Sequence, residues 1–158
     1  MKKGKILNRA MNDAICAMGH TDVLIVSDAG YNVPAEGVIC VDLAITQDLP
    51  SVLEIVKLLT TDFIYERCIV AEEQKKYNPV FHQQLVEHLD RCEIETVPHT
   101  DIIGQWRDAA KVIIRTGGLE PWGNIVFTSG IDAPAYFAKE GVITPDYYES
   151  RASYEETE

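Results

Sequence analysis

The sequence predicts an α/β domain of three layers (α/β/α), in which helices cover both faces of a mostly parallel sheet of about six strands. Two observations lead to this fold class. Short apolar, β-branched runs alternate along the chain with segments whose apolar residues recur every three or four positions. The chain has 158 residues, 46% of them hydrophobic and 25% charged, which suits one globular domain with a sizeable core.

The elements are expected in alternating order along the chain. Apolar residues from Ile6 to Met18 line one face of a first helix, and Gly19 stands where a helix-ending glycine belongs. Apolar runs then predict strands at 23–27, 39–45, 63–71, 94–97, 112–115 and 125–128. Helical periodicity, with a proline opening two of the segments, predicts helices at 50–59, 79–92 and about 100–110.

The composition and the apolar periodicity of the sequence change beyond Gly130. Apolar periodicity fades, and the last residues are acidic and rich in tyrosine. We therefore expect a domain over residues 1–131 and a C-terminal extension over 132–158 that is extended, partly mobile and of unknown role.

The charge balance disfavours two classes of partner. Lysine and arginine number 14 against 25 aspartates and glutamates, a formal charge of −11 that repels nucleic acid and anionic membrane surfaces. Charged residues interrupt every apolar stretch before it reaches the ~18 residues that a membrane span needs. The first residues lack the apolar segment of a secretory signal, so a cytoplasmic location is expected.

Cysteines and glycines give no sign of a metal or nucleotide site. Cys16, Cys40, Cys68 and Cys92 are widely separated, without a C-x-x-C pair, and are interpreted as buried free thiols. The stretch 115–124 has glycines but neither a G-x-G-x-x-G nor a Walker arrangement.

Chemistry in a parallel sheet is expected in the loops beyond the carboxyl ends of the strands. We assign to these loops His20, Asp28, His99 and the turn 121–124. An imidazole titrates near neutral pH, so His20 suits acid/base catalysis, although a histidine after a helix can also simply cap its carbonyls. Asp28 could accept a sugar hydroxyl or cap its own turn.

The turn before the last predicted strand has the composition of a sugar site. Trp122 followed by Gly123 and Asn124 offers an aromatic face beside an amide, although a tryptophan there could also only cover the core. His82 and His88 are six residues apart, on different helix faces, and are interpreted as solvated. A metal held by His20, Asp28 and His99 has no supporting spacing.

Several separate blocks of the sequence match one known family. They are MKKGKILN at 1–8, MGHTD at 18–22, VSDAG at 26–30, Pro34, VDLAITQDLPS at 41–51, AEE at 71–73, NP at 78–79, His99, IRTGG at 114–118 and PWGNI at 121–125. With these blocks the chain resembles the D-ribose pyranase and L-fucose mutarotase family, and GHTD with SDAG is closer to the ribose branch. The resemblance extends from Met1 to about Ile131.

The resemblance implies a cofactor-free, metal-free isomerase that interconverts pyranose and furanose forms and anomers of a free monosaccharide, D-ribose first. It implies that His20 is the acid/base and that Asp28, His99, Trp122, Gly123 and Asn124 bind the sugar. It also implies a homo-oligomer, typically a decamer, whose sites are completed by neighbouring subunits.

The chain departs from the family pattern at two places inside the domain. Trp122 stands where a tyrosine is usual, and Ile102, Ile103 and Gly104 occupy the span where the ribose branch has a lysine. Two alternatives therefore stay open: a mutarotase for L-fucose or a related sugar, and a sugar-binding protein that has lost turnover.

Overall fold

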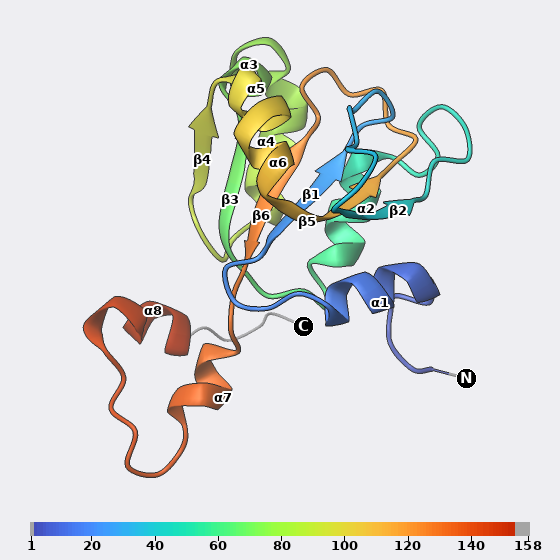
Figure 1. The fold of residues 1–158 in the computed structure, drawn as a ribbon. Helices are drawn as coiled ribbons and strands as arrows, with labels where there is room; N and C mark the ends of the chain where they lie inside the picture. Colours follow the sequence, from blue (N-terminus) through green and yellow to red (C-terminus); the bar gives the residue numbers. More distant parts are fainter. Residues whose placement is uncertain (1, 154–158) are drawn as a thin grey trace.

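The computed structural model describes residues 2–153 and shows a six-stranded sheet with helices on both faces (Figure 1). The strand order is β2-β5-β1-β6-β3-β4. The strands are β1 (Val23–Ser27), β2 (Ile39–Asp42), β3 (Tyr65–Ala71), β4 (Ile94–Val97), β5 (Ala110–Arg115) and β6 (Ile125–Ser129). All neighbouring pairs are parallel except those of β6 with β1 and β3, so the predicted fold class is confirmed.

The direction of β6 decides which loops meet. Val26 of β1 pairs with Ile125, and Val23 pairs with Thr128, so β6 begins where β1 ends. We call this side of the sheet the carboxyl edge, and the opposite side, where β1 begins and β6 ends, the amino edge. In Figure 1 the β1 arrow points up to the carboxyl edge and the β6 arrow points down to the amino edge.

Side-chain caps fix the starts of the first two helices along the chain. The helical elements are α1 (Arg9–Cys16), α2 (Val52–Leu59), α3 (Glu72–Tyr77), α4 (Pro79–His88), α5 (His99–Asp101), η1 (Ile102–Trp106), α6 (Arg107–Ala109), α7 (Ala133–Phe137), η2 (Asp146–Tyr148) and α8 (Glu149–Ala152). Asn8 caps α1 by accepting from the Met11 N–H, which makes this helix shorter than predicted. Ser51 and Glu54 form a capping box at the start of α2.

The helices differ from the prediction at two further places. The segment expected over 100–110 is the continuous run α5-η1-α6, bent at Gly104, whose backbone angles (φ −111°, ψ −105°) are not helical. The chain after β3 forms α3, a helix that the periodicity did not predict, because six residues give too short a pattern.

The core has two parts, one on each face of the sheet. Leu24 and Val26 of β1 point to the face covered by α1, α2 and α4, where Phe127 is the largest fully buried side chain. Ile25 points to the other face, against Ile102 of the α5-η1-α6 segment. Burial on both faces explains why the strands read as continuous apolar runs.

Several side chains are placed differently from their prediction. All four cysteines are free thiols, but only Cys68 is buried and Cys92 half-buried, whereas Cys16 and Cys40 are exposed. His82 and His88 are half-buried instead of solvated, since they bond to Gln74 and Thr60 respectively. Burial lowers the pKa of both histidines.

The prediction of an extended C-terminal tail is wrong over the described part of the extension. Short helical elements cover 133–137 (α7) and 146–152 (η2 and α8), joined by a loop, and lie below the amino edge in Figure 1. Asp132 caps α7 by accepting from the Ala135 N–H, and the rings of Phe137 and Tyr148 pack at 5.4 Å. Short-range capping and ring packing replace the missing apolar periodicity. Residues 154–158 lie outside the described residues.

Among residues 2–153, no helix is both long and apolar enough to cross a membrane.

Candidate active site

A cavity of about 330 Å³ opens at the carboxyl edge of the sheet. Its walls include Asp28, Tyr31, His99, Leu119, Trp122 and Asn124. Asp28 follows β1 and Asn124 precedes β6, and the antiparallel pairing of these strands brings the two residues together. The structure thus gathers four of the six predicted site residues around one cavity.

Asp28 and Asn124 hold each other in a fixed orientation. The Asn124 Nδ2 donates to Asp28 Oδ2 at 3.0 Å, and Asn124 Oδ1 accepts from the Asp28 backbone N–H at 3.0 Å. Asp28 Oδ1 also accepts from the Gly30 N–H at 2.8 Å, so this residue caps its own turn as well as lining the cavity. Free lone pairs on the carboxylate and the second amide N–H remain for hydroxyl groups of a ligand.

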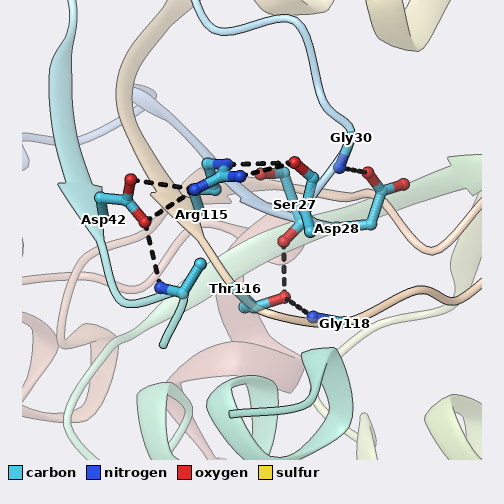
Figure 2. Close-up of polar contacts among 9 residues, drawn as sticks. Ser27, Asp28, Gly30, Asp42, Arg115, Thr116 and Gly118 are labelled. Carbon is cyan, nitrogen blue, oxygen red and sulfur yellow. Dashed lines mark hydrogen bonds and ion pairs between the residues drawn. The ribbon is translucent and has the colours of Figure 1, made fainter. Parts of the chain in front are cut away.

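A polar network behind Asp28 fixes its loop to the rest of the sheet (Figure 2). Arg115 donates from Nε and Nη2 to the Ala29 carbonyl and pairs through Nη1 with Asp42 at 3.0 Å. Thr116 is buried, donates to the Ser27 carbonyl and accepts from the Gly118 N–H. These contacts connect the ends of β1, β2 and β5.

The backbone packs too closely around position 117 for any residue other than glycine. A Cβ atom at Gly117 would lie 2.2 Å from the Thr46 carbonyl oxygen and 2.7 Å from the Leu49 carbonyl oxygen. The Asp48 N–H donates to the Gly117 carbonyl at 2.7 Å. The 41–51 and 114–118 blocks of the sequence therefore pack backbone against backbone, which only glycine permits.

Trp122 is held by contacts that sequence reasoning missed. Its carbonyl accepts from Nε2 of Gln74, which is fully buried, and Gln74 Oε1 lies 3.2 Å from His82 Nδ1. The indole lies 5.4 Å from the Tyr77 ring at an angle of 36°. Gln74 and Tyr77 belong to α3, and neither a buried glutamine nor a short helix has a sequence signal. Trp122 is half-buried, so it both covers the core and reaches the cavity.

Gly123 and His99 have different positions relative to the cavity. Gly123 lies outside the cavity wall and shapes the turn, since a Cβ there would meet Glu120 Cβ at 2.6 Å. His99 lies on the wall at the start of α5, where its backbone N–H donates to Glu73 Oε2 at 3.0 Å. Of the turn residues predicted to bind the sugar, Trp122 and Asn124 therefore line the cavity and Gly123 does not.

His20 lies at the amino edge, so its expected place beside Asp28 is wrong for one chain. His20 comes before β1 and Asp28 after it, and the five residues of the strand span about 17 Å. The His20 side chain is 41% exposed, and its Nε2 lies 3.2 Å from both Glu66 Oε2 and the Tyr148 hydroxyl. The described part of the chain holds no cluster of histidine, cysteine or acidic groups that could bind a metal ion.

A larger cavity, of about 530 Å³, lies at the amino edge between β3 and the C-terminal extension. Its walls include Glu66, Arg91, Asp132 and Arg151. Size alone does not decide the site of sugar chemistry. The smaller cavity combines an indole face with an amide, a carboxylate and an imidazole, which is the combination that holds a small polyol.

Comparison with known proteins identifies a matching family model, similar curated proteins and a similar solved structure. A family model described as the RbsD / FucU transport protein family matches residues 1–132. A D-ribose pyranase 2 of Rubrobacter xylanophilus is 43% identical over 152 residues, covering 96% of this chain and 98% of its own. A D-ribose pyranase of Actinobacillus pleuropneumoniae is 38% identical and covers 83% of this chain and 99% of its own. Among solved structures, Bacillus subtilis RbsD complexed with D-ribose has a TM-score of 0.77 and 32% identity, over 83% of this chain and 98% of its own.

Proposed function

Because the chain belongs to the RbsD / FucU family, we propose that it is an isomerase that interconverts the ring forms and anomers of free D-ribose. The observation that carries this proposal is the cavity at the carboxyl edge, where the Asp28–Asn124 pair and the Trp122 indole face one space. The names of the relatives supply the substrate, and the cavity supplies groups suited to a small polyhydroxylated ring.

The reaction needs only the movement of a proton. Opening a ribose ring breaks the bond between C1 and the ring oxygen and forms the C1 carbonyl. One proton leaves the anomeric hydroxyl and one reaches the ring oxygen, so the overall charge does not change. The open aldehyde then closes through either of two hydroxyls, giving a pyranose or a furanose. General acid/base assistance of this kind contributes about 10²–10⁴ in rate.

His20 is the proposed acid/base, and it serves the cavity of a neighbouring subunit. Its own cavity lies at the far end of β1, so one chain cannot bring the imidazole to a sugar held beside Asp28. We propose a homo-oligomer, a decamer as the family resemblance implies. Exposed apolar side chains at the carboxyl edge, Ile45, Leu49, Tyr77 and Leu119, supply a surface for such contact. The cytoplasmic location stays a prediction from the sequence.

Trp122 takes the position of the usual tyrosine as a stacking surface for the sugar ring. The Asp28 carboxylate accepts hydrogen bonds from the sugar hydroxyls, and the Asn124 amide donates to them. His99 forms part of the cavity wall. Without a lysine after His99, orientation of the sugar depends on these neutral and acidic groups.

Saturation-transfer NMR on D-ribose tests the proposal directly. The wild-type protein is expected to accelerate exchange between pyranose and furanose signals, and His20→Ala is expected to lose this acceleration with its assembly unchanged by light scattering. No acceleration of any pentose or 6-deoxyhexose would favour a sugar-binding protein without turnover. Acceleration restricted to L-fucose would favour the mutarotase alternative.

Mixing two inactive variants tests whether a site is shared. Asp28→Ala damages the cavity, and His20→Ala removes the proton carrier. If each site takes these residues from different chains, oligomers reassembled from equal amounts recover about a quarter of wild-type activity. Zero recovery after proven mixing would contradict a shared site.

A further inference from the structure

The C-terminal extension reaches the same histidine to which we assign the chemistry. Tyr148 of η2 and Arg151 of α8 both contact Glu66 of β3, and Tyr148 also contacts His20. These two residues lie beyond residue 132, where the family model ends. The extension therefore brings side chains to the amino edge that the domain itself does not contain.

Glu66 is the centre of this group. Its carboxylate, 13% exposed, lies within 3.2 Å of His20 Nε2, the Tyr148 hydroxyl and Arg151 Nη1. Gly130 allows this placement, because a Cβ atom there would lie 2.6 Å from the Glu66 Cγ. Glu66 is thus surrounded by donors and fixed in one direction.

The contacts determine which ring nitrogen of His20 carries the proton. A carboxylate can only accept hydrogen bonds, so a neutral His20 can pair with Glu66 Oε2 only through a proton on Nε2. The Tyr148 hydroxyl then donates to Glu66 Oε1, at 3.2 Å. With the opposite tautomer, the bare Nε2 lone pair would face a carboxylate oxygen, and the Tyr148 hydroxyl, which lies 3.2 Å from Nε2, could donate to it only by giving up its bond to Glu66 Oε1.

Tyr148 is itself restrained in this position. Its ring packs against Phe137 at 5.4 Å, and the Arg151 guanidinium lies 5.2 Å from the ring centroid. Burial and the neighbouring Glu66 carboxylate raise the pKa of Tyr148, which keeps the phenol protonated and able to donate at neutral pH.

We propose that Glu66, Tyr148 and Arg151 are positioning residues for His20, which hold its Nε2–H so that Nδ1 is the nitrogen presented to the sugar in the neighbouring subunit. This inference rests on the proposed function of His20. It assigns to the C-terminal extension a part in catalysis, through the orientation and tautomer of one imidazole.

Single substitutions in the full-length protein test the proposal, with kcat and KM for D-ribose exchange measured separately. Tyr148→Phe is expected to lower kcat about fivefold, the size of one lost hydrogen bond, with KM unchanged because the cavity is untouched. The matched control is Tyr147→Phe, since Tyr147 is 77% exposed on the same element and should keep wild-type kcat. Glu66→Gln is expected to lower kcat about tenfold or more.

Nitrogen-15 NMR of histidine-labelled protein reads the tautomer without any need for turnover. The His20 signals, assigned by their loss in His20→Ala, are expected to show a protonated Nε2 and an unprotonated Nδ1. Glu66→Gln is expected to mix the two tautomers, because a glutamine amide can donate as well as accept.

The outcomes separate this inference from the proposed function. An active wild-type protein whose Tyr148→Phe and Glu66→Gln variants keep or exceed its kcat, or whose His20 proton lies on Nδ1, would overturn the inference alone. A wild-type protein without ribose exchange would overturn the proposed function, while the tautomer would still be measured.

Discussion

The two edges of the sheet are built in different ways. At the carboxyl edge, Asp28 and Asn124 are fixed by two partly buried hydrogen bonds to each other and by the Arg115 and Thr116 network behind them. At the amino edge, His20 lies on an exposed loop and contacts Glu66 of β3 and Tyr148 of the C-terminal extension, and Arg151 of the extension pairs with the same Glu66. Under the proposed function, a rigid frame would therefore hold the sugar, whereas the proposed proton carrier depends on contacts that the C-terminal extension supplies.

The largest expected effect is on the stability of the carboxyl edge. Gly117→Ala would force a Cβ against two carbonyl oxygens at 2.2 and 2.7 Å, so the backbone must shift. We expect a loss of about 3 kcal/mol in the free energy of unfolding, measured by urea denaturation. Gly19→Ala is the control at the amino edge, where a new Cβ would meet only Asp22 Oδ2 at 3.4 Å. Equal losses in both variants would mean that the two edges do not differ in rigidity.

A second substitution asks whether the carboxyl edge controls binding. Trp122→Ala removes an aromatic face and is expected to weaken ribose binding by about 1–3 kcal/mol, measured by calorimetry, without unfolding the domain, although the lost packing of the indole on the core also lowers its stability. Trp122→Phe should retain most of the affinity, because it keeps a ring. Trp106→Phe, at a tryptophan outside the cavity wall, should bind ribose like the wild type. Unchanged affinity in Trp122→Ala would make this residue a core residue alone.

The smallest expected effect concerns the loop that carries His20. Asp22 Oδ2 accepts from Lys111 Nζ at 2.6 Å and from the Gly19 N–H at 2.7 Å, and the Lys111 contact is the main reason that the pKa of Asp22 is lowered. A carboxyl whose pKa falls on folding stabilises the fold above its unfolded value, near 3.8, and loses this contribution as the pH falls through its folded value.

Lys111→Met is therefore expected to cost less than about 1 kcal/mol at pH 7, because the pair is partly exposed. The difference from the wild type should shrink between pH 4 and pH 2, in urea denaturation at each pH. Substitution of the exposed Lys5 by methionine serves as the control. A difference that stays constant down to pH 2 would exclude Asp22 as its origin.

The sequence predicted the sheet well because its strands are buried on both faces. Val23–Ser27 and Ile125–Ser129 read as continuous apolar runs, and burial on both sides leaves little room for any other pattern. Asp28 is predicted from its place at the end of the first run and Asn124 from the aromatic and amide composition of its turn, and the family resemblance implies a sugar-binding role for both. Their direct contact was not predictable, because it depends on β6 running antiparallel to β1.

Other parts of the site had no signal in the sequence. Gln74 donates to the Trp122 carbonyl from a six-residue helix. A single buried polar residue in so short a helix produces no apolar periodicity that could predict its position. The prediction grouped His20 with loops that follow strands, but His20 comes before β1 and therefore lies at the amino edge. Tyr148 and Glu66 are 82 residues apart, so only the fold could show that they meet.

The separation of His20 from its own cavity by the length of β1 has a consequence for how the protein must be assayed. If His20 serves the cavity of a neighbouring subunit, as proposed, dilution below the dissociation constant of the assembly should extinguish specific activity, although each released chain keeps its own cavity. The concentration at half-maximal turnover per milligram would then report how tightly the subunits hold together.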